Sequence, residues 1–217
     1  MPDIIYLDNN ATTRVAPEVL EAMLPYLKDL YGNPSSIHTF GGRVMNRVNE
    51  AREKVAALLG ARPEEIVFTS CGSESDSTAI LSALECQPAR RHIVTTRVEH
   101  PAVRTLCRHL RDRKGYRLTE VSVDAQGRLD MDEYRDALSD DTAVVSIMWA
   151  NNETGVIFPV EDCARMAKAC GALFHTDAVQ AVGKVPINLA DSAIDMLSLS
   201  GHKLHAPKGV GLSLIHI

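Results

Sequence analysis

The chain has 217 residues, of which 45% are hydrophobic and 24% charged, and its 23 basic and 28 acidic residues give a formal net charge of −5. This composition excludes a disordered protein, a collagen and a small disulfide scaffold, and one large domain, or one domain with part of another, is expected. The acidic balance argues against general nucleic-acid binding, which goes with a basic excess, and no apolar run reaches the ~18–20 residues of a membrane helix. No signal-peptide pattern is visible, and the five cysteines are an odd number without a C-x-x-C pair, so we expect reduced thiols in a cytoplasmic protein.

The first quarter of the chain predicts a short extended segment and two helices. Residues 4–7 are strand-like, and Pro17 marks the first turn of a helix that ends before the turn-rich stretch 32–36. From Arg43 onward, apolar residues recur every three to four positions, which is typical of an amphipathic helix. We expect that helix to end at Gly60.

From residue 66 onward, short apolar runs alternate with helical patterns. The predicted strands are 66–69, 93–95, 117–123, 143–149, 172–174 and 194–198, the predicted helices are 73–84, 101–110, 131–138 and 160–169, and residues 208–212 resemble the approach to a further strand. Such alternation favours an α/β fold with a mostly parallel sheet and helices on both faces. Ligands of these sheets bind just beyond the carboxyl ends of the strands, so polar residues at those ends are the candidates for a site.

Small residues join the first of these strands to its helix in the stretch 69–75. A helix N-terminus offers free N–H groups and a positive dipole end, and the lack of bulk lets a phosphate approach. The stretch is neither G-x-G-x-x-G nor a P-loop. An ordinary capped turn explains the same residues equally well.

Two further strand ends carry weaker signals. His100 follows the second strand, where it can stack on a ligand or move protons, although a structural histidine at a helix start is the more common case. Asn152 lies in an Asn-Asn-Glu-Thr-Gly stretch after the fourth strand. Two amides there suit the polar rim of a ligand, but they are equally typical of turns.

The last two strand ends carry an acid and an amine. Asp177 ends an apolar strand and is costly to bury without a cationic partner, either a protonated heterocyclic nitrogen or simply a lysine or arginine. Lys203 lies among small and polar residues and can act as a nucleophile if its amine is partly neutral, although most lysines are surface residues. His202 and His205 lack a third ligand type nearby, so no metal site is expected.

Together these features match one cofactor. Pyridoxal phosphate requires a lysine that bonds to its aldehyde, an acidic partner for its ring nitrogen and a seat for its phosphate.

The chain resembles the cysteine desulfurases of the class V aminotransferase family, and most closely the nitrogen-fixation (NifS-type) branch. The matching stretches are 6–13, 32–36, 68–84, 99–103, 148–155, 174–186 and 198–211. The resemblance implies the large domain of the fold type I pyridoxal-phosphate enzymes, with residues 1–212 as an incomplete cofactor-binding domain. Residues 213–217 depart from the family and are expected to be a non-native tail.

The resemblance also implies roles for individual residues. Lys203 would hold the cofactor covalently and move protons at the α-carbon of the substrate, and His100 would stack on the ring and assist acid–base steps. Asp177 would pair with the ring nitrogen, Gln180 would bind the phenolic oxygen, and Asn152 would lie near the ring and the substrate carboxylate. The phosphate would be bound by Gly72, Ser73, Ser200 and His202.

The implied reaction removes sulfur from L-cysteine and leaves L-alanine and an enzyme persulfide, whose sulfur goes to an iron–sulfur scaffold protein, with nitrogenase maturation as one destination. Family members are homodimers of nearly twice this length, and none of the five cysteines here matches the persulfide-forming one. We therefore expect this chain to be inactive alone. Two alternatives stay open: another class V enzyme such as a selenocysteine lyase, and a non-catalytic dimerising or binding fragment. Neither a membrane nor a nucleic acid is an expected partner.

Overall fold

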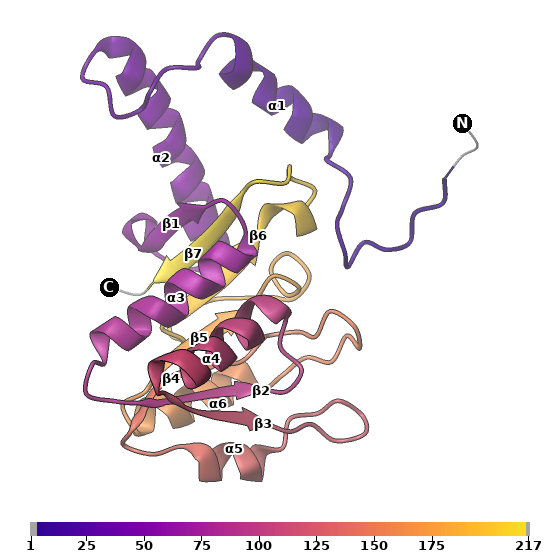
Figure 1. Cartoon of the computed structure of the whole chain (residues 1–217). Helices are drawn as coiled ribbons and strands as arrows, with labels where there is room; N and C mark the ends of the chain where they lie inside the picture. Colours follow the sequence, from indigo (N-terminus) through magenta and orange to yellow (C-terminus); the bar gives the residue numbers. More distant parts are fainter. Residues whose placement is uncertain (1–3, 216–217) are drawn as a thin grey trace.

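One sheet organises the structure, a computed structural model that describes residues 4–215 (Figure 1). Its strands are β1 (Ile66–Thr69), β2 (His92–Thr96), β3 (Arg117–Val121), β4 (Thr142–Ser146), β5 (Leu173–Asp177), β6 (Met196–Ser200) and β7 (Gly211–Ile215). Their order is β1-β7-β6-β5-β4-β2-β3. Within the described residues, β7 is the one strand that runs antiparallel to its neighbours, so the expected mostly parallel sheet is confirmed.

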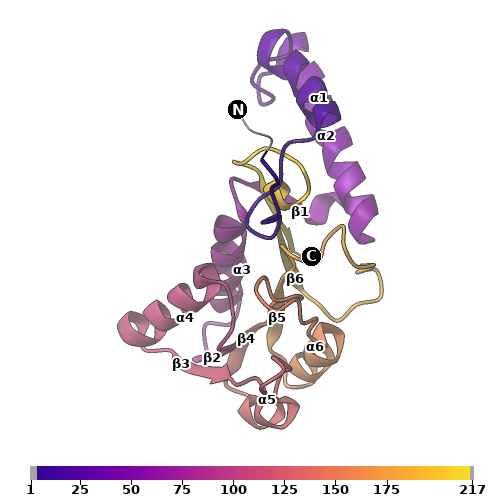
Figure 2. The same cartoon turned by 90° about the vertical axis from the view of Figure 1, so that its right-hand side faces the viewer.

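Helices pack on both faces of this sheet. The helices of the chain are α1 (Pro17–Lys28), which does not pack on the sheet, α2 (Thr39–Leu59), α3 (Gly72–Cys86), α4 (Pro101–Lys114), α5 (Met131–Ala137) and α6 (Val160–Ala169), with two short 3-10 segments, η1 (Pro63–Glu65) and η2 (Gly201–Lys203). Figure 2 shows α3 and α4 on one face and α5 and α6 on the other. Every residue of β2, β4 and β6 is buried between these layers, and their sequences accordingly contain only apolar residues, serine, threonine and one histidine.

Two helices have histidine N-caps. His38 Nδ1 accepts a hydrogen bond from the Gly41 N–H at 3.1 Å, so α2 begins at Thr39, four residues before the position that periodicity predicts. His100 Nδ1 accepts from the Ala102 N–H at 3.2 Å at the start of α4. This cap fixes His100 at the carboxyl end of β2.

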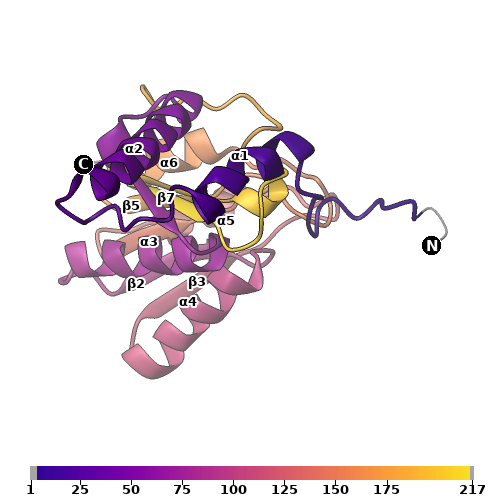
Figure 3. The ribbon, with the colours of Figure 1, turned by 90° about the horizontal axis from the view of Figure 1, so that it is seen from above.

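The segment that begins at residue 4 and the helix α1 lie apart from the sheet (Figures 1 and 3). The strand-like prediction for residues 4–7 is wrong: they form no strand, and all four are exposed. An extended segment becomes a strand only when a neighbouring strand takes up its backbone hydrogen bonds, and no strand lies beside this one.

Two predicted strands are shorter in the structure. The run 143–149 leaves the sheet after Ser146, although the Trp149 N–H still donates to the Asp177 carbonyl at 2.9 Å. The run 117–123 ends at Val121, and Val123 forms an isolated bridge with Leu129.

Residues 213–215 belong to β7. Ser213 pairs with Val67 of β1 and with Ser198 of β6, and Leu214 is fully buried. The structure thus continues the sheet through the first residues of the expected tail. That the tail is non-native stays a prediction, and residues 216–217 lie outside the described part of the chain.

Candidate functional site

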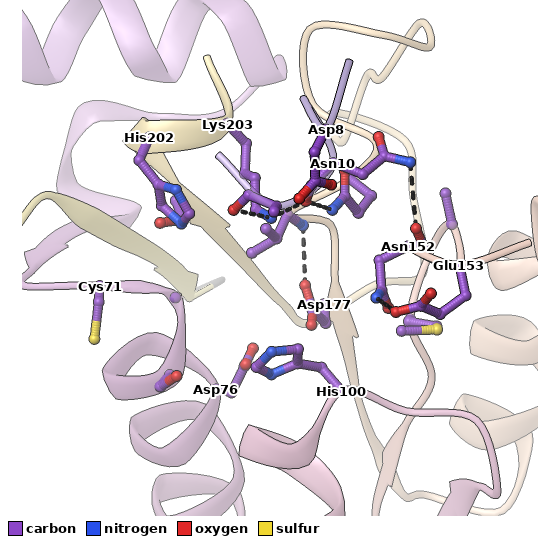
Figure 4. A pocket seen from close by; sticks show the side chains of 18 residues that line it. Asp8, Asn10, Cys71, Asp76, His100, Asn152, Glu153, Asp177, His202 and Lys203 are labelled. Carbon is purple, nitrogen blue, oxygen red and sulfur yellow. Dashed lines mark hydrogen bonds between the residues drawn. The ribbon is translucent and has the colours of Figure 1, made fainter. Parts of the chain in front are cut away.

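A cavity of about 540 Å³ opens at the carboxyl ends of β1, β2, β4, β5 and β6 (Figure 4). Its lining includes all nine residues that the sequence singled out: Gly72, Ser73, His100, Asn152, Asp177, Gln180, Ser200, His202 and Lys203. Because parallel strands end at the same edge, segments far apart in the sequence meet there.

One end of the cavity is built from the N-terminus of α3. A Cβ added to Gly72 would lie 3.1 Å from Val179 Cγ2 and 3.4 Å from Ser200 Cβ, so a larger residue would crowd this corner, which the glycine leaves open. Cys71 occupies the N-cap position without a side-chain cap, which leaves the first N–H groups of this 15-residue helix for another acceptor. The corner suits a small anion such as a phosphate.

Ser200 and His202 lie on the other side of this corner. Ser200 is buried, and His202 Nδ1 lies 3.0 Å from Thr12 Oγ1. Burial lowers the pKa of His202, and the positive charges of Lys203 and Lys208 lower it further. The ring is therefore neutral near pH 7 and binds by hydrogen bonding.

Asp177 forms the floor of the cavity. It is the last residue of β5, only 6% of its surface is exposed, and its Oδ1 accepts from the Val179 N–H at 2.9 Å. Burial raises the pKa of Asp177, against the lowering effects of that N–H group, His100 and Lys203. None of the ion pairs among residues 4–215 includes this carboxyl group, so a cationic ligand atom has a buried partner available here.

The Lys203 side chain enters the cavity from η2. Its Nζ donates hydrogen bonds to the Asn10 carbonyl and, at 2.9 Å, to the Ala11 carbonyl. Burial and the nearby charge of Lys184 lower the pKa of Lys203, while Asp177 and Asp8 raise it. A half-buried amine with a lowered pKa has a larger neutral fraction and is a better nucleophile.

The two amides of the site differ in what they contact. Gln180 Nε2 donates to the Asn10 carbonyl at 2.8 Å, and the Asn10 side chain donates to the Asn152 carbonyl at 3.2 Å. Asn152 Nδ2 in turn donates to Glu153 Oε1 at 2.8 Å (Figure 4). The N-terminal segment thus connects two sides of the cavity.

Sequence reasoning missed this segment as part of the site. Asp8, Asn10 and Ala11 line the cavity, although some 190 residues separate them from Lys203. The match of residues 6–13 to the family was the available signal.

Two buried acids were missed as well. Asp76 is 1% exposed, its Oδ1 lacks a hydrogen-bond partner and lies 3.7 Å from His175 Nε2, and burial followed by the charge of Asp177 raises its pKa well above the usual range. Burial raises the pKa of Glu99 to about 8, and Glu99 Oε1 accepts from the Met148 N–H at 3.0 Å. The position of Asp76, one helical turn after Gly72, was a usable signal because residues four apart share a helix face.

Other kinds of site find no support in the described residues. No group of three or more His, Cys, Asp or Glu among residues 4–215 could hold a metal ion. In the same part of the chain, each helix is too short or too polar to cross a membrane.

Comparisons with known proteins agree with this geometry. Residues 5–216 match the family described as Aminotransferase class-V. The chain is 60% identical over 208 residues to the cysteine desulfurase of Trichormus azollae and 60% identical over 209 residues to the cysteine desulfurase NifS of Azotobacter vinelandii, covering 96% of this chain and 52% of each relative. It therefore spans about half the length of these curated relatives.

Solved structures give the same result. A NifS-like protein superposes with a TM-score of 0.93 at 44% identity, covering 97% of this chain and 58% of that one. A structure titled "SspA in complex with cysteine" gives 0.93 at 38% identity, covering 98% and 61%. With the family match extending over nearly all of the described residues, the chain belongs to the class V aminotransferase family.

Proposed function

We propose that the protein carrying this chain is a pyridoxal-phosphate-dependent cysteine desulfurase, which converts L-cysteine to L-alanine and supplies the sulfur for iron–sulfur cluster assembly, with nitrogenase maturation as one use. The observation that carries the proposal is the meeting, in one cavity, of the buried Asp177 carboxyl, the half-buried Lys203 amine and the open corner at Gly72. The identity to cysteine desulfurases supports the same reaction.

The residues present fit pyridoxal phosphate. The corner at Gly72, with Ser73, Ser200 and His202 around it, would hold the phosphate. Asp177 has no cation paired with it among the described residues, as expected of a carboxylate that binds a protonated ring nitrogen. When bound, the cofactor supplies an electron sink for the bonds at the substrate α-carbon.

The other site residues would bind and orient. Lys203 Nζ would hold the cofactor covalently and would also serve as the base that moves protons at the α-carbon, a role favoured by its lowered pKa. His100 lines the cavity and is held in place as the N-cap of α4, so it would stack on the ring. Gln180 would donate to the phenolic oxygen, and Asn152 would lie beside the substrate carboxylate.

The sulfur acceptor of the reaction would lie outside this chain. In the proposed step, a cysteine thiolate attacks the substrate sulfur, and the bond between that sulfur and the β-carbon breaks. The electron pair of that bond stays with the β-carbon, which takes up a proton, so the products are a persulfide and L-alanine. Burial raises the pKa values of Cys107 and Cys163 to about 12, so neither provides a thiolate near neutral pH. Cys71 is exposed and lines the cavity, but none of the five cysteines matches the position of the persulfide-forming cysteine in the family that the chain resembles, so we expect this chain alone to release no sulfide from cysteine.

A homodimer and a cytoplasmic location complete the proposal. None of the twelve residues of α1 is buried, and Leu27 and Tyr31 are 69% and 74% exposed. Exposed apolar side chains of this kind are typical of a protein–protein interface, and we propose that a second subunit covers them.

Borohydride trapping of the intact protein with pyridoxal phosphate, followed by peptide mass mapping, tests the proposal. We expect a phosphopyridoxyl group on Lys203 and none in the Lys203→Ala variant, together with alanine formation from L-cysteine. A label confined to other lysines would refute the cofactor assignment. Turnover of selenocysteine but not cysteine would replace the desulfurase with a selenocysteine lyase.

A further inference from the structure

The turn that follows β5 carries a second lysine close to the site. Residues 178–185 form a short helical turn, in which the Val182 N–H donates to the Ala178 carbonyl at 3.0 Å and the Lys184 N–H donates to the Ala181 carbonyl at 2.9 Å. Gly183 has a φ of +75°, which favours glycine there. The spacing of four residues brings Lys184 to Gln180, and Lys184 Nζ donates to Gln180 Oε1 at 2.7 Å.

This contact decides which end of the Gln180 amide faces the cavity. With Oε1 occupied by the ammonium of Lys184, the free donor Nε2 points inward and donates to the Asn10 carbonyl at 2.8 Å. That carbonyl also accepts a hydrogen bond from Lys203 Nζ. The two lysines are thus linked through one amide and one carbonyl group.

Lys184 also acts on Lys203 by its charge. After burial, the charge of Lys184 is the largest influence that lowers the pKa of Lys203. Asp177 from β5 and Asp8 from the N-terminal segment act in the opposite direction, and His202 lies next to the amine in η2. Two neighbouring amines suppress each other's protonation in this way.

Lys184 itself does not line the cavity. It lines a separate hollow of about 450 Å³ with Leu58, Val182 and Ile187, on the outer side of the turn. Any effect of Lys184 on the site must therefore pass through Gln180 or through its charge.

We propose that Lys184 is a positioning residue of this site, whose ammonium group holds the Gln180 amide with Nε2 toward the cavity and keeps a second positive charge close to the Lys203 amine. The inference rests on the proposed function. It explains why a lysine, and not a neutral side chain, stands four residues after the amide.

The test follows the covalent reaction of Lys203 with added pyridoxal phosphate in the cofactor-free intact protein, trapped by borohydride across a pH series. Lys184→Met removes a positive charge, so the Lys203 pKa rises and the midpoint of the pH–rate curve shifts upward by about half a unit. Below the midpoint, trapping is roughly threefold slower, because a smaller share of the amine is neutral. Raising the salt from ~0.05 to ~0.5 M reduces the shift, since the charge on this exposed side chain is screened.

Further variants separate the roles of the charge and of the hydrogen bond. Lys184→Arg keeps the charge and a donor and leaves the midpoint at the wild-type value, while Lys184→Gln removes the charge but keeps an N–H donor on a shorter side chain and shifts the midpoint as Met does. Lys168→Met, the same change at an exposed position of α6, leaves the curve unchanged. Lys184→Met and Gln180→Ala should each shift the absorption band of the bound cofactor. Because Lys184 acts through Gln180, the double variant should shift this band by less than the sum of the two single shifts.

The outcomes distinguish this inference from the proposed function. If the wild-type protein carries the label on Lys203 and both neutral Lys184 variants titrate as it does at low salt, the role of Lys184 is refuted and the cofactor assignment stands. If the wild-type protein gives no label on Lys203, the cofactor assignment and the role of Lys184 are both refuted.

Discussion

The floor and the rim of the cavity are held in different ways. The floor is the end of a sheet whose strands β2, β4 and β6 are buried throughout. The rim includes the N-terminal segment, which is anchored by hydrogen bonds: the Thr13 N–H donates to the His202 carbonyl at 2.9 Å and the Ala16 N–H to the His205 carbonyl at 3.0 Å. Packing thus fixes the acid at the floor, whereas main-chain hydrogen bonds from η2 and the loop after it fix the segment that meets the Lys203 amine.

The largest contrast is expected for stability. Phe174 of β5 is fully buried, so Phe174→Ala lowers the free energy of unfolding by about 3–5 kcal/mol through lost burial and the cavity left behind. Leu27 of α1 is 69% exposed, and Leu27→Ala changes the free energy of unfolding of a single, dissociated subunit by less than about 0.5 kcal/mol. Urea unfolding measures both, and similar losses for the two variants would show that α1 is as well packed as the sheet.

Cofactor affinity provides the next contrast. Asp177→Asn removes the negative charge of the floor while keeping an acceptor for the Val179 N–H, so we expect pyridoxal phosphate to bind roughly a hundredfold more weakly. Asn10→Ala keeps the carbonyl that contacts Lys203 and loses only the bond to the Asn152 carbonyl, which predicts a loss of at most about tenfold. Spectroscopic titration of the cofactor-free protein with pyridoxal phosphate measures the affinity of each variant. An equal loss of affinity in both would show that the rim contributes as much to cofactor binding as the floor.

The pH dependence of stability isolates the buried acids of the floor. Burial raises the pKa of Glu99 from 4.5 to about 8, so between these values the folded state holds a proton that the unfolded chain has released. The free energy of unfolding therefore falls as pH rises, by at most ~1.4 kcal/mol per unit from this group. Burial also raises the pKa values of Asp76 and Asp177, which gives the same sign.

A buried histidine opposes this slope at lower pH. Burial lowers the pKa of His175 from 6.5 to about 3, which makes stability fall as pH drops below 6.5. The effect of the acids is thus best seen between about pH 6.5 and 8. Glu99→Gln keeps the acceptor for the Met148 N–H and should flatten the profile in this window, as urea unfolding at several pH values can measure. Parallel profiles for wild type and variant would contradict the raised pKa.

Two adjacent glycines of α2 are expected to respond to the same substitution with opposite sign. A Cβ on Gly42 meets nothing within 4 Å, so Gly42→Ala should stabilise the protein by about 0.5–1 kcal/mol through helix propensity. A Cβ on Gly41 would lie 2.6 Å from the Ser36 carbonyl oxygen and 2.7 Å from that of Asn33, and Gly41→Ala should destabilise by about 1–3 kcal/mol. Thermal melts give the sign of each change in stability. Stabilisation by both substitutions would mean that the backbone of the turn before α2 moves away from the added Cβ at little cost.

Much of the fold can be predicted from the sequence because its signals are local. The alternation of apolar runs and helical patterns from residue 66 onward corresponds to β1 to β6 and α3 to α6. The rule that ligands bind at strand ends places Asp177 and Lys203 at one edge of the sheet, where both line the cavity. The contact between Gln180 and Lys184 is also local, since a spacing of four residues is visible in the sequence.

The rest depends on contacts between distant segments. The spacing of four from Gly72 places Asp76 on the cavity face of α3, but its deep burial depends on the packing of α3 against β5 and β6, which are distant in the sequence. The local propensity of residues 4–7 predicts an extended shape correctly, but a strand needs a neighbour. The role of Asn10 at the rim depends on a partner some 190 residues away.

The position of β7 between β1 and β6 has a consequence for synthesis of the chain. Thr69 of β1 pairs with Gly211, about 140 residues later, and β7 is the neighbour of β1 in the sheet. At ~5–20 residues per second, a ribosome takes roughly 7–28 s to reach that partner after completing β1. For this interval the nascent chain carries a finished strand whose place in the sheet does not yet exist, so translation speed and chaperone supply should affect the yield of folded protein more than they do for a sheet assembled in chain order.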